Sequence, residues 1–268
     1  MESIAMMKRQ FRSAAILMSL SLFGTIPGVT ALAGESSQTP ALELNIHLCH
    51  TGKRQAVLRV FADGRLQASS PENDGRLVED RITREEAQAL VAEVKAAVSS
   101  CDLSTTTLQS ELSEHSRQTG LTAEIQDADD VALVVEMDAR PLEIRCTALG
   151  VLCQRFPRAE RLQSFSAIHD RLMNLTAIVQ AGGRPAAEKL ALKASLQMTA
   201  EHPEIRPWSI EELAMVRARP DGSRYIQFRR RASGSESAST EEVWLTSIFE
   251  TPGRETRVSV QPPESVIR

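Results

Sequence analysis

Apolar residues recur every three or four positions in two segments, and this spacing places them on one face of a helix. The first helix is expected to begin after Thr83, which together with Glu86 has the spacing of a capping box. The second is expected over residues 158–179. The predicted apolar faces are Ala87, Leu90, Val91, Val94 and Val98 in the first helix and Leu162, Phe165, Ile168, Leu172, Leu175 and Val179 in the second.

Short runs of alternating apolar and polar residues predict antiparallel strands before each of these helices. The expected strands are residues 41–47, 55–62, 65–69 and, more weakly, 76–80 in a first set, and 121–125, 131–137 and 142–146 in a second. Residues 102–119, between the two sets, are rich in Ser, Thr, Gln and Glu and have little periodicity. This composition predicts a mobile connection.

The C-terminal part of the chain predicts a third helix followed by a meander of four strands. Paired glycines at 182–183 are suited to end one helix, and Pro185 is suited to the first turn of the next, over residues 186–201. The meander that follows reaches Gln261.

The first hairpin of this meander has a turn whose chemistry predicts its register. The turn sequence Arg-Pro-Asp-Gly-Ser occupies residues 219–223, where proline suits the second position and glycine tolerates a left-handed conformation. Counting back from the turn pairs Val216 with Ile226 and Ala214 with Phe228, so that four apolar side chains share one face.

These elements predict an α+β protein in which each antiparallel meander is followed or preceded by a packing helix. We expect a signal peptide at residues 1–33, a disulfide-bearing module at 34–182 and a smaller helix-plus-meander module at 183–268. In element order, about the last 80 residues resemble the cystatin-like and PepSY-like architectures. The glutamine-x-valine-x-glycine signature of cystatin inhibitors is absent from this module, so the resemblance implies no inhibitory function.

The N-terminal segment has the three parts of a secretory leader. Basic residues are followed by an apolar run over residues 14–29 and by Ala31-Leu32-Ala33, whose small residues suit a signal peptidase. Gly24, Pro27 and Gly28 interrupt the run, which favours removal over membrane anchoring. We therefore expect a secreted or periplasmic protein that begins at Gly34 and has no membrane span after cleavage.

Charge and aromatic content exclude some classes of partner. The chain has a formal net charge of −4, and loss of a basic leader makes the remainder more acidic, whereas nucleic acids attract basic surfaces. One tyrosine and two tryptophans also leave few rings on which bases or sugars could stack. We expect no nucleic-acid partner and no cofactor.

Four cysteines in a chain predicted to be exported favour two disulfides. Three pairings are possible, and we expect Cys49 with Cys101 and Cys146 with Cys153. The first pairing depends on the weak fourth strand, because four strands would bring the end of the following helix to the end of the first strand.

His47, Cys49 and His50 form the densest group of possible soft-metal ligands. On an extended strand His47 and Cys49 point the same way, whereas His50 points to the other face. At most two of these ligands therefore converge without a bend. The alternative interpretation is a disulfide-bonded Cys49 beside two ordinary histidines.

The predicted outward face of the C-terminal hairpin carries a cluster of arginines that could bind an anion, because guanidinium groups bind oxyanions through paired hydrogen bonds. The residues of this candidate binding patch are Arg217, Arg219, Arg229 and Arg231, with Tyr225 and Gln227 between them. The alternative is a solvated sheet face whose charges are balanced by Glu241, Glu242 and Glu250 on the next strand.

Motifs of enzymes are missing from the sequence. There is no glycine-x-serine-x-glycine elbow, glycine-rich phosphate loop or His-Glu-x-x-His sequence. His169 and Asp170 are adjacent but project about 100° apart on a helix, so no catalytic pair is expected. We predict a non-catalytic binding or interaction protein of the cell envelope or extracellular space, whose partner is a protein or an anionic ligand. The alternatives are a metal-dependent hydrolase or metal-binding protein that uses His47, Cys49 and His50, and a purely structural envelope component.

Overall fold

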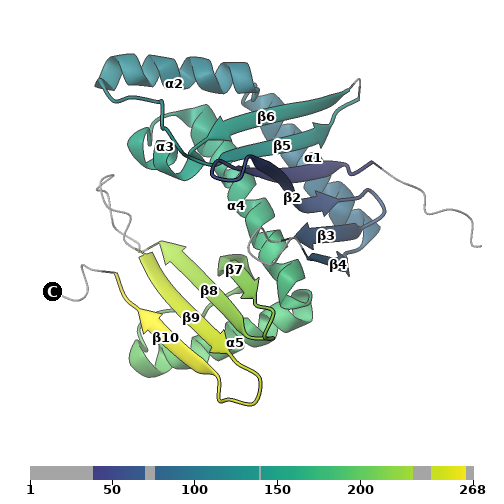
Figure 1. Cartoon of the computed structure of the whole chain (residues 1–268), viewed down its shortest axis with the longest axis vertical. Coiled ribbons are helices and arrows are strands. Elements are labelled where there is room, and N and C mark those ends of the chain that lie inside the picture. The colour runs from purple at the N-terminus through teal and green to yellow at the C-terminus, as the bar shows by residue number, and fades with distance from the viewer. Residues whose placement is uncertain (1–38, 70–75, 139, 232–242, 264–268) are drawn as a thin grey trace, which may run out of the picture. The chain divides into compact units, whose positions relative to one another are not determined.

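The computed structural model describes residues 39–69, 76–138, 140–231 and 243–263. Within these residues the protein has the predicted α+β class, with a six-stranded and a four-stranded antiparallel sheet (Figure 1). The predicted signal peptide, residues 1–33, lies outside the described part of the chain. Among the helices that are described, none is long and apolar enough to cross a membrane.

The first sheet joins the two predicted strand sets into one, because β1 pairs antiparallel with both β2 and β5. Its strand order is β4-β3-β2-β1-β5-β6. The weak fourth strand is present as β4. The strands are β1 (Leu42–Leu48), β2 (Lys53–Val60), β3 (Arg65–Ser69), β4 (Leu77–Arg81), β5 (Asp130–Glu136) and β6 (Pro141–Thr147).

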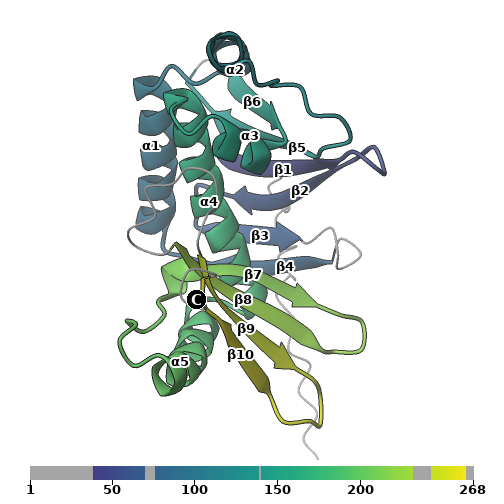
Figure 2. The ribbon, with the colours of Figure 1, turned by 90° about the vertical axis from the view of Figure 1, so that its left-hand side faces the viewer.

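Helices α1 (Arg84–Ser100) and α4 (Glu160–Ala181) pack beside each other and run across the strand direction, as Figure 2 shows. The capping box of α1 is confirmed, since the Glu86 amide donates to Thr83 Oγ1 at 3.1 Å and the Thr83 amide donates to Glu86 Oε2 at 2.9 Å. Both predicted apolar faces lie mainly in the core of the first sheet.

The predicted mobile connection is wrong, because helix α2 (Thr105–Thr119) occupies it. Ser104 caps the start of α2, and Leu108 and Leu112, one turn apart, are buried. Two leucines and a cap are too weak a periodic signal to stand out among so many polar residues. The Glu111 carboxylate of this helix accepts hydrogen bonds from the first amides of α4, so α2 holds the start of the longer helix.

Two smaller predictions in this region also fail. The expected strand at residues 121–125 has no ladder partner, and helix α3 (Leu149–Arg155) was not predicted. Ala148, whose backbone is left-handed with φ of 53°, directly precedes helix α3, and the short length of the helix leaves no periodic signal. Leu149 and Leu152 anchor it in the first core.

The C-terminal part forms the predicted helix and four-stranded meander. Strand order is β10-β9-β8-β7, and the buried residues include both tryptophans, Trp208 and Trp244. The elements are α5 (Arg184–Glu201), the 3-10 turn η1 (Ile210–Glu212), β7 (Leu213–Ala218), β8 (Arg224–Arg231), β9 (Val243–Glu250) and β10 (Arg257–Gln261).

The predicted hairpin register is confirmed near the turn and wrong at its far end. Val216 pairs with Ile226 as expected, but Phe228 lies opposite Leu213 and not Ala214. A register shift between Leu213 and Met215 inserts one residue into β7, and such a bulge has no fixed sequence signature.

Helix α4 contributes to both cores. Leu162, Phe165 and Leu172 are buried in the core of the first sheet, whereas Ala177 and Ala181 are buried in the core of the second. The predicted module boundary after residue 182 thus follows a helix whose last turns pack against the C-terminal sheet.

Candidate functional site

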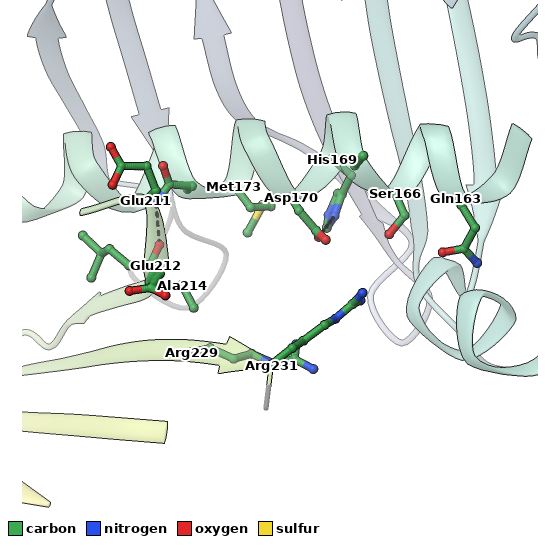
Figure 3. A pocket seen from close by; sticks show the side chains of 13 residues that line it. Gln163, Ser166, His169, Asp170, Met173, Glu211, Glu212, Ala214, Arg229 and Arg231 are labelled. Carbon is green, nitrogen blue, oxygen red and sulfur yellow. Dashed lines mark hydrogen bonds and ion pairs between the residues drawn. The ribbon is translucent and has the colours of Figure 1, made fainter. Parts of the chain in front are cut away.

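A cavity of about 430 Å³ lies between helix α4 and the start of the C-terminal sheet (Figure 3). We call it the α4–β8 cavity. Most of its lining is polar, and it contains acidic, basic and neutral hydrogen-bonding groups. The lining residues are Gln163, Ser166, Ala167, His169, Asp170, Met173 and Asn174 from α4, Glu211, Glu212, Leu213 and Ala214 from η1 and β7, and Arg229 and Arg231 from β8.

The periodicities of the two elements place these side chains. On α4, Gln163, Ser166 and Asp170 are three and four residues apart and so share one helix face. On β8, Arg229 and Arg231 alternate with Phe228 and Arg230, which belong to the opposite face of the sheet. The Asn174 amide ties α4 to η1 and β7 by donating to the carbonyl oxygens of Ile210 and Leu213, at 2.8 and 2.9 Å.

His169 and Asp170 form a hydrogen bond, although adjacent helical positions project about 100° apart. The imidazole Nδ1 lies 3.1 Å from the Asp170 carboxylate. The exposed aspartate side chain reaches along the helix surface to the ring, which the angle between successive Cα–Cβ directions does not forbid. The pair fixes the orientation of the imidazole at the wall of the cavity.

The Glu212 carboxylate is neutralised by the protein itself. Its Oε1 lies 2.5 Å from Arg230 Nε and 2.7 Å from Arg206 Nη2. Burial acts to raise the pKa of this carboxyl, but hydrogen bonds from Arg230 and from the Ser209 amide, with the arginine charges, outweigh burial and lower that pKa. Glu212 therefore remains ionised and does not need a ligand cation.

The cavity is polarised along its length. In Figure 3, Glu211 and Glu212 lie at one end, whereas the side chains of Arg229 and Arg231 extend toward the part of α4 that carries His169, Ser166 and Gln163. A hydrogen bond from Ser209 is the main cause that lowers the pKa of Glu211, so the acidic end is charged at neutral pH. The opposite end presents two guanidinium groups together with amide and hydroxyl donors.

The structure distributes the predicted arginine patch over three cavities. Arg229 and Arg231 line the α4–β8 cavity, whereas Arg217 and Arg219 line two others. Tyr225 pairs with Arg217 across the hairpin, and its hydroxyl is 3.1 Å from Ser247 Oγ and accepts a hydrogen bond from Gln227.

Of the three carboxylates expected to balance this patch, Glu250 alone lies within the described residues. Glu241 and Glu242 lie outside them. Glu250 accepts a hydrogen bond from Arg224 Nε at 2.9 Å and pairs with Lys193. Both of these partners belong to the α5 side of the sheet, away from the predicted patch.

A second group of polar residues gathers at the end of β1. One ligand atom each from Cys49, His50 and Asp129 lies within 4.8 Å of the other two, and all three residues are exposed. The predicted partner His47 is not in this group, because its Nδ1 lies 3.7 Å from Asp130 Oδ2. Partial desolvation and the Asp129 carboxylate raise the pKa of the Cys49 thiol.

Asp129 could not be identified by sequence spacing, since it is 80 residues from Cys49. The signal that could have found it is the acidic turn sequence at residues 127–130, directly before the expected strand at 131–137. Pairing of β1 with β5 places His47 opposite Asp130 and so brings this turn to the end of β1.

The predicted disulfides are absent: all four cysteines lie in the described residues and each is a free thiol. The Cys49 thiol donates to the Asp127 carbonyl at 3.1 Å, whereas the Cys101 thiol donates to Ser164 Oγ at 3.3 Å. The expected approach of Cys49 to Cys101 fails because α1 crosses the strands and does not run back along them (Figure 2).

The other two cysteines belong to the first core. Burial raises the pKa of the Cys146 thiol to about 12 and also raises that of Cys153. Each side chain interacts with nearby polar atoms, Cys153 with the Ser166 hydroxyl and Cys146 with the Thr147 carbonyl. Both thiols are therefore protonated at neutral pH and fill space as small apolar groups.

Comparison with protein-family models gives no match, and the searches of curated proteins and of solved structures give no significant match.

Proposed function

We propose that the protein is a non-catalytic binding protein whose α4–β8 cavity holds an anionic group of its ligand. One observation carries this proposal: Arg229 and Arg231 line the same cavity as His169, Ser166 and Gln163. We also propose that it acts in the secreted or periplasmic space, as its leader predicts; recovery of a chain that begins at Gly34 would test this.

The chemistry of the basic end favours a carboxylate or phosphate. A guanidinium group presents parallel N–H donors that match two oxygens of such a group, and neutral donors beside it satisfy the remaining lone pairs. The cavity volume of about 430 Å³ is suited to a small ligand or a short segment of a larger one. Because Glu212 is paired with Arg230 and Arg206, its charge opposes an incoming anion less than an unpaired carboxylate would.

Binding of simple anions tests the proposal. Citrate and inorganic phosphate are titrated into the protein by isothermal calorimetry, and the shift of the unfolding temperature is measured at the same concentrations. We expect saturable binding by at least one anion. Its affinity should fall about tenfold or more in Arg231→Ala and in Arg229→Ala. The fall should be smaller in Arg231→Lys, because lysine keeps the positive charge but lacks the paired N–H donors of the guanidinium group.

Arg219→Ala is the matched control, because it removes an arginine of the same sheet that lines a different cavity. Circular dichroism establishes that each variant is folded before its affinity is compared. Binding that is equal in all variants, or no binding of either anion by the folded protein, would remove the α4–β8 cavity from consideration.

A further inference from the structure

The exposed group at the end of β1 is built from two segments that are distant in sequence. Cys49 and His50 belong to the turn between β1 and β2, and Asp129 precedes β5. Because β1 and β5 are antiparallel, the end of the first strand necessarily meets the start of the second. The three side chains therefore converge as a direct result of the sheet topology.

Hydrogen bonds hold these two segments together. The Cys49 amide donates to Asp129 Oδ1 at 2.9 Å, and the Cys49 thiol donates to the Asp127 carbonyl at 3.1 Å. On the other side, the Gly52 amide donates to the Leu48 carbonyl at 2.9 Å and closes the turn. Gly52 has φ of 63°, a left-handed value that a residue with a side chain rarely adopts, and so supports the tight reversal.

We propose that Cys49, His50 and Asp129 form a binding site for a divalent transition metal ion of the zinc class. Their ligand atoms, a sulfur, an imidazole nitrogen and a carboxylate oxygen, lie within 4.8 Å of one another. Ligands bound to one tetrahedral zinc at about 2.0–2.3 Å are separated by about 3.5 Å, so small rotations of exposed side chains close the site. Calcium and magnesium are disfavoured because they require oxygen ligands throughout.

The proposed site has three protein ligands and a neighbouring cavity. His50 and Asp129 also line a cavity of about 490 Å³, whose other walls include Ile46, Leu48 and Met173. Three protein ligands leave one tetrahedral position for water or for a donor atom of a second molecule. This cavity gives such a molecule room beside the ion, and it is a second observation, independent of the ligand spacing, that points to an occupant.

The site differs from the one that the sequence suggested. His47 was the expected neighbour of Cys49 on one strand face, but its ring faces the Asp130 carboxylate. His50 takes its place because the chain bends at residues 49–52 and is no longer an extended strand. His47 therefore provides a control that tests this structure specifically.

Titration with Zn²⁺ and Co²⁺ tests the proposal on the full chain kept under a metal-free reductant. Calorimetry measures the stoichiometry and affinity of Zn²⁺. The absorption spectrum of the Co²⁺ complex reports a thiolate ligand through its sulfur-to-metal charge-transfer band. We expect one ion per chain, a charge-transfer band that disappears in Cys49→Ser, and an affinity for Zn²⁺ that falls at least tenfold in Cys49→Ser, His50→Ala and Asp129→Asn. Removing a direct ligand should lower the metal affinity at least as much as removing a residue that hydrogen-bonds to a ligand, which lowers it about 10–100-fold.

Two controls distinguish this site from its alternatives. His47→Ala should leave the affinity within about twofold of the starting protein, and so should Cys101→Ser, which removes a thiol that contacts Ser164. All three proposed ligands are exposed, so their variants are expected to keep the circular dichroism of the parent. Absence of Zn²⁺ binding, binding that survives in Cys49→Ser, or binding that is lost in His47→Ala would each overturn the proposal. None of these outcomes depends on the anion titrations of the α4–β8 cavity.

Discussion

The two sheets of this protein differ in the aromatic content of their cores and in how far they enclose their ion pairs. The core of the first sheet is aliphatic apart from a few larger side chains, among which Phe156 and Phe165 are fully buried. The core of the C-terminal sheet contains both tryptophans, and Arg230 stacks over Trp208 with its guanidinium carbon 4.4 Å from the ring centroid. Both side chains of the Arg230–Glu212 pair are only 11% exposed, whereas those of the Arg59–Glu43 pair in the first sheet are 40% and 21% exposed. The comparison teaches that the C-terminal sheet encloses an ion pair at the border of its core, where solvent screens it less.

Phe165→Ala should have the largest effect on stability. This side chain is fully buried in the first core, and truncation leaves a cavity that costs about 3–5 kcal/mol in the free energy of unfolding. Urea denaturation followed by circular dichroism measures the change. Phe249→Ala is the control, because that ring is 46% exposed and its removal should cost less than about 1 kcal/mol. Equal effects of the two substitutions would contradict the assigned core.

Arg230→Met should destabilise the protein by about 2–3 kcal/mol, less than the loss of Phe165. It removes hydrogen bonds to the Arg206 and Pro207 carbonyls, both at 2.8 Å, and leaves the largely enclosed Glu212 carboxylate without its nearest partner. Tryptophan fluorescence during urea denaturation reports the change in the second core, where both tryptophans lie.

Arg206→Met is the matched control for this measurement, since it removes a partner of the same carboxylate. The Arg206 side chain is 64% exposed, whereas that of Arg230 is 11% exposed, so solvent screens the Arg206 pair and its loss should cost less than about 1 kcal/mol. A larger cost for Arg206 than for Arg230 would contradict the role assigned to burial.

Acidification should weaken the C-terminal sheet through Glu212 and Glu250. Burial acts to raise the pKa of each carboxyl, but hydrogen bonds from arginine lower both below the ordinary value of 4.5. Each group therefore binds its proton more weakly in the folded protein, and its stabilising contribution is present above about 4.5 and lost as the pH falls through the lowered pKa.

Glu212→Gln should make the urea midpoint depend less on pH below 4.5, an effect smaller than that of Arg230→Met. Glu143→Gln is the comparison in the first sheet, where hydrogen bonding to Arg145 lowers the pKa of a more exposed carboxyl. We expect it to change the pH dependence less than Glu212→Gln does. Equal changes would mean that the ion pairs of the two sheets contribute alike, and the opposite order would contradict the role assigned to burial.

Local chemistry predicted the elements whose signals are contained within a few residues. The capping box at Thr83 and the helical spacing of α4 gave the correct helices, and the turn at 219–223 gave the correct pairing of Val216 with Ile226. The bulge that displaces Ala214 and the burial of only two leucines in α2 have no comparable local signal. Whether the bulge and helix α2 form depends on how these segments pack against the rest of the fold.

Candidate sites were predictable only in part for the same reason. The sequence singled out Arg229 and Arg231 but could not show that they lie in one cavity with His169, because that requires α4 to pack against β7 and β8. It singled out Cys49 and His50 but not Asp129, whose approach depends on the pairing of β1 with β5. The sequence identified candidate residues by their chemical type, but it could not predict which residues distant in the chain would lie beside them.

Helix α4 has a consequence for how such a protein can change during evolution. Ala177 and Ala181 belong to the core of the C-terminal sheet, although they precede the glycine pair that separates the two halves in sequence. A recombination event at that glycine pair would transfer the C-terminal sheet without one wall of its core and leave an apolar surface on the other product. Leu162, Phe165 and Leu172 of the same helix belong to the core of the first sheet, so an exchange that carried all of α4 away would damage that core instead. The two halves are therefore expected to be inherited together.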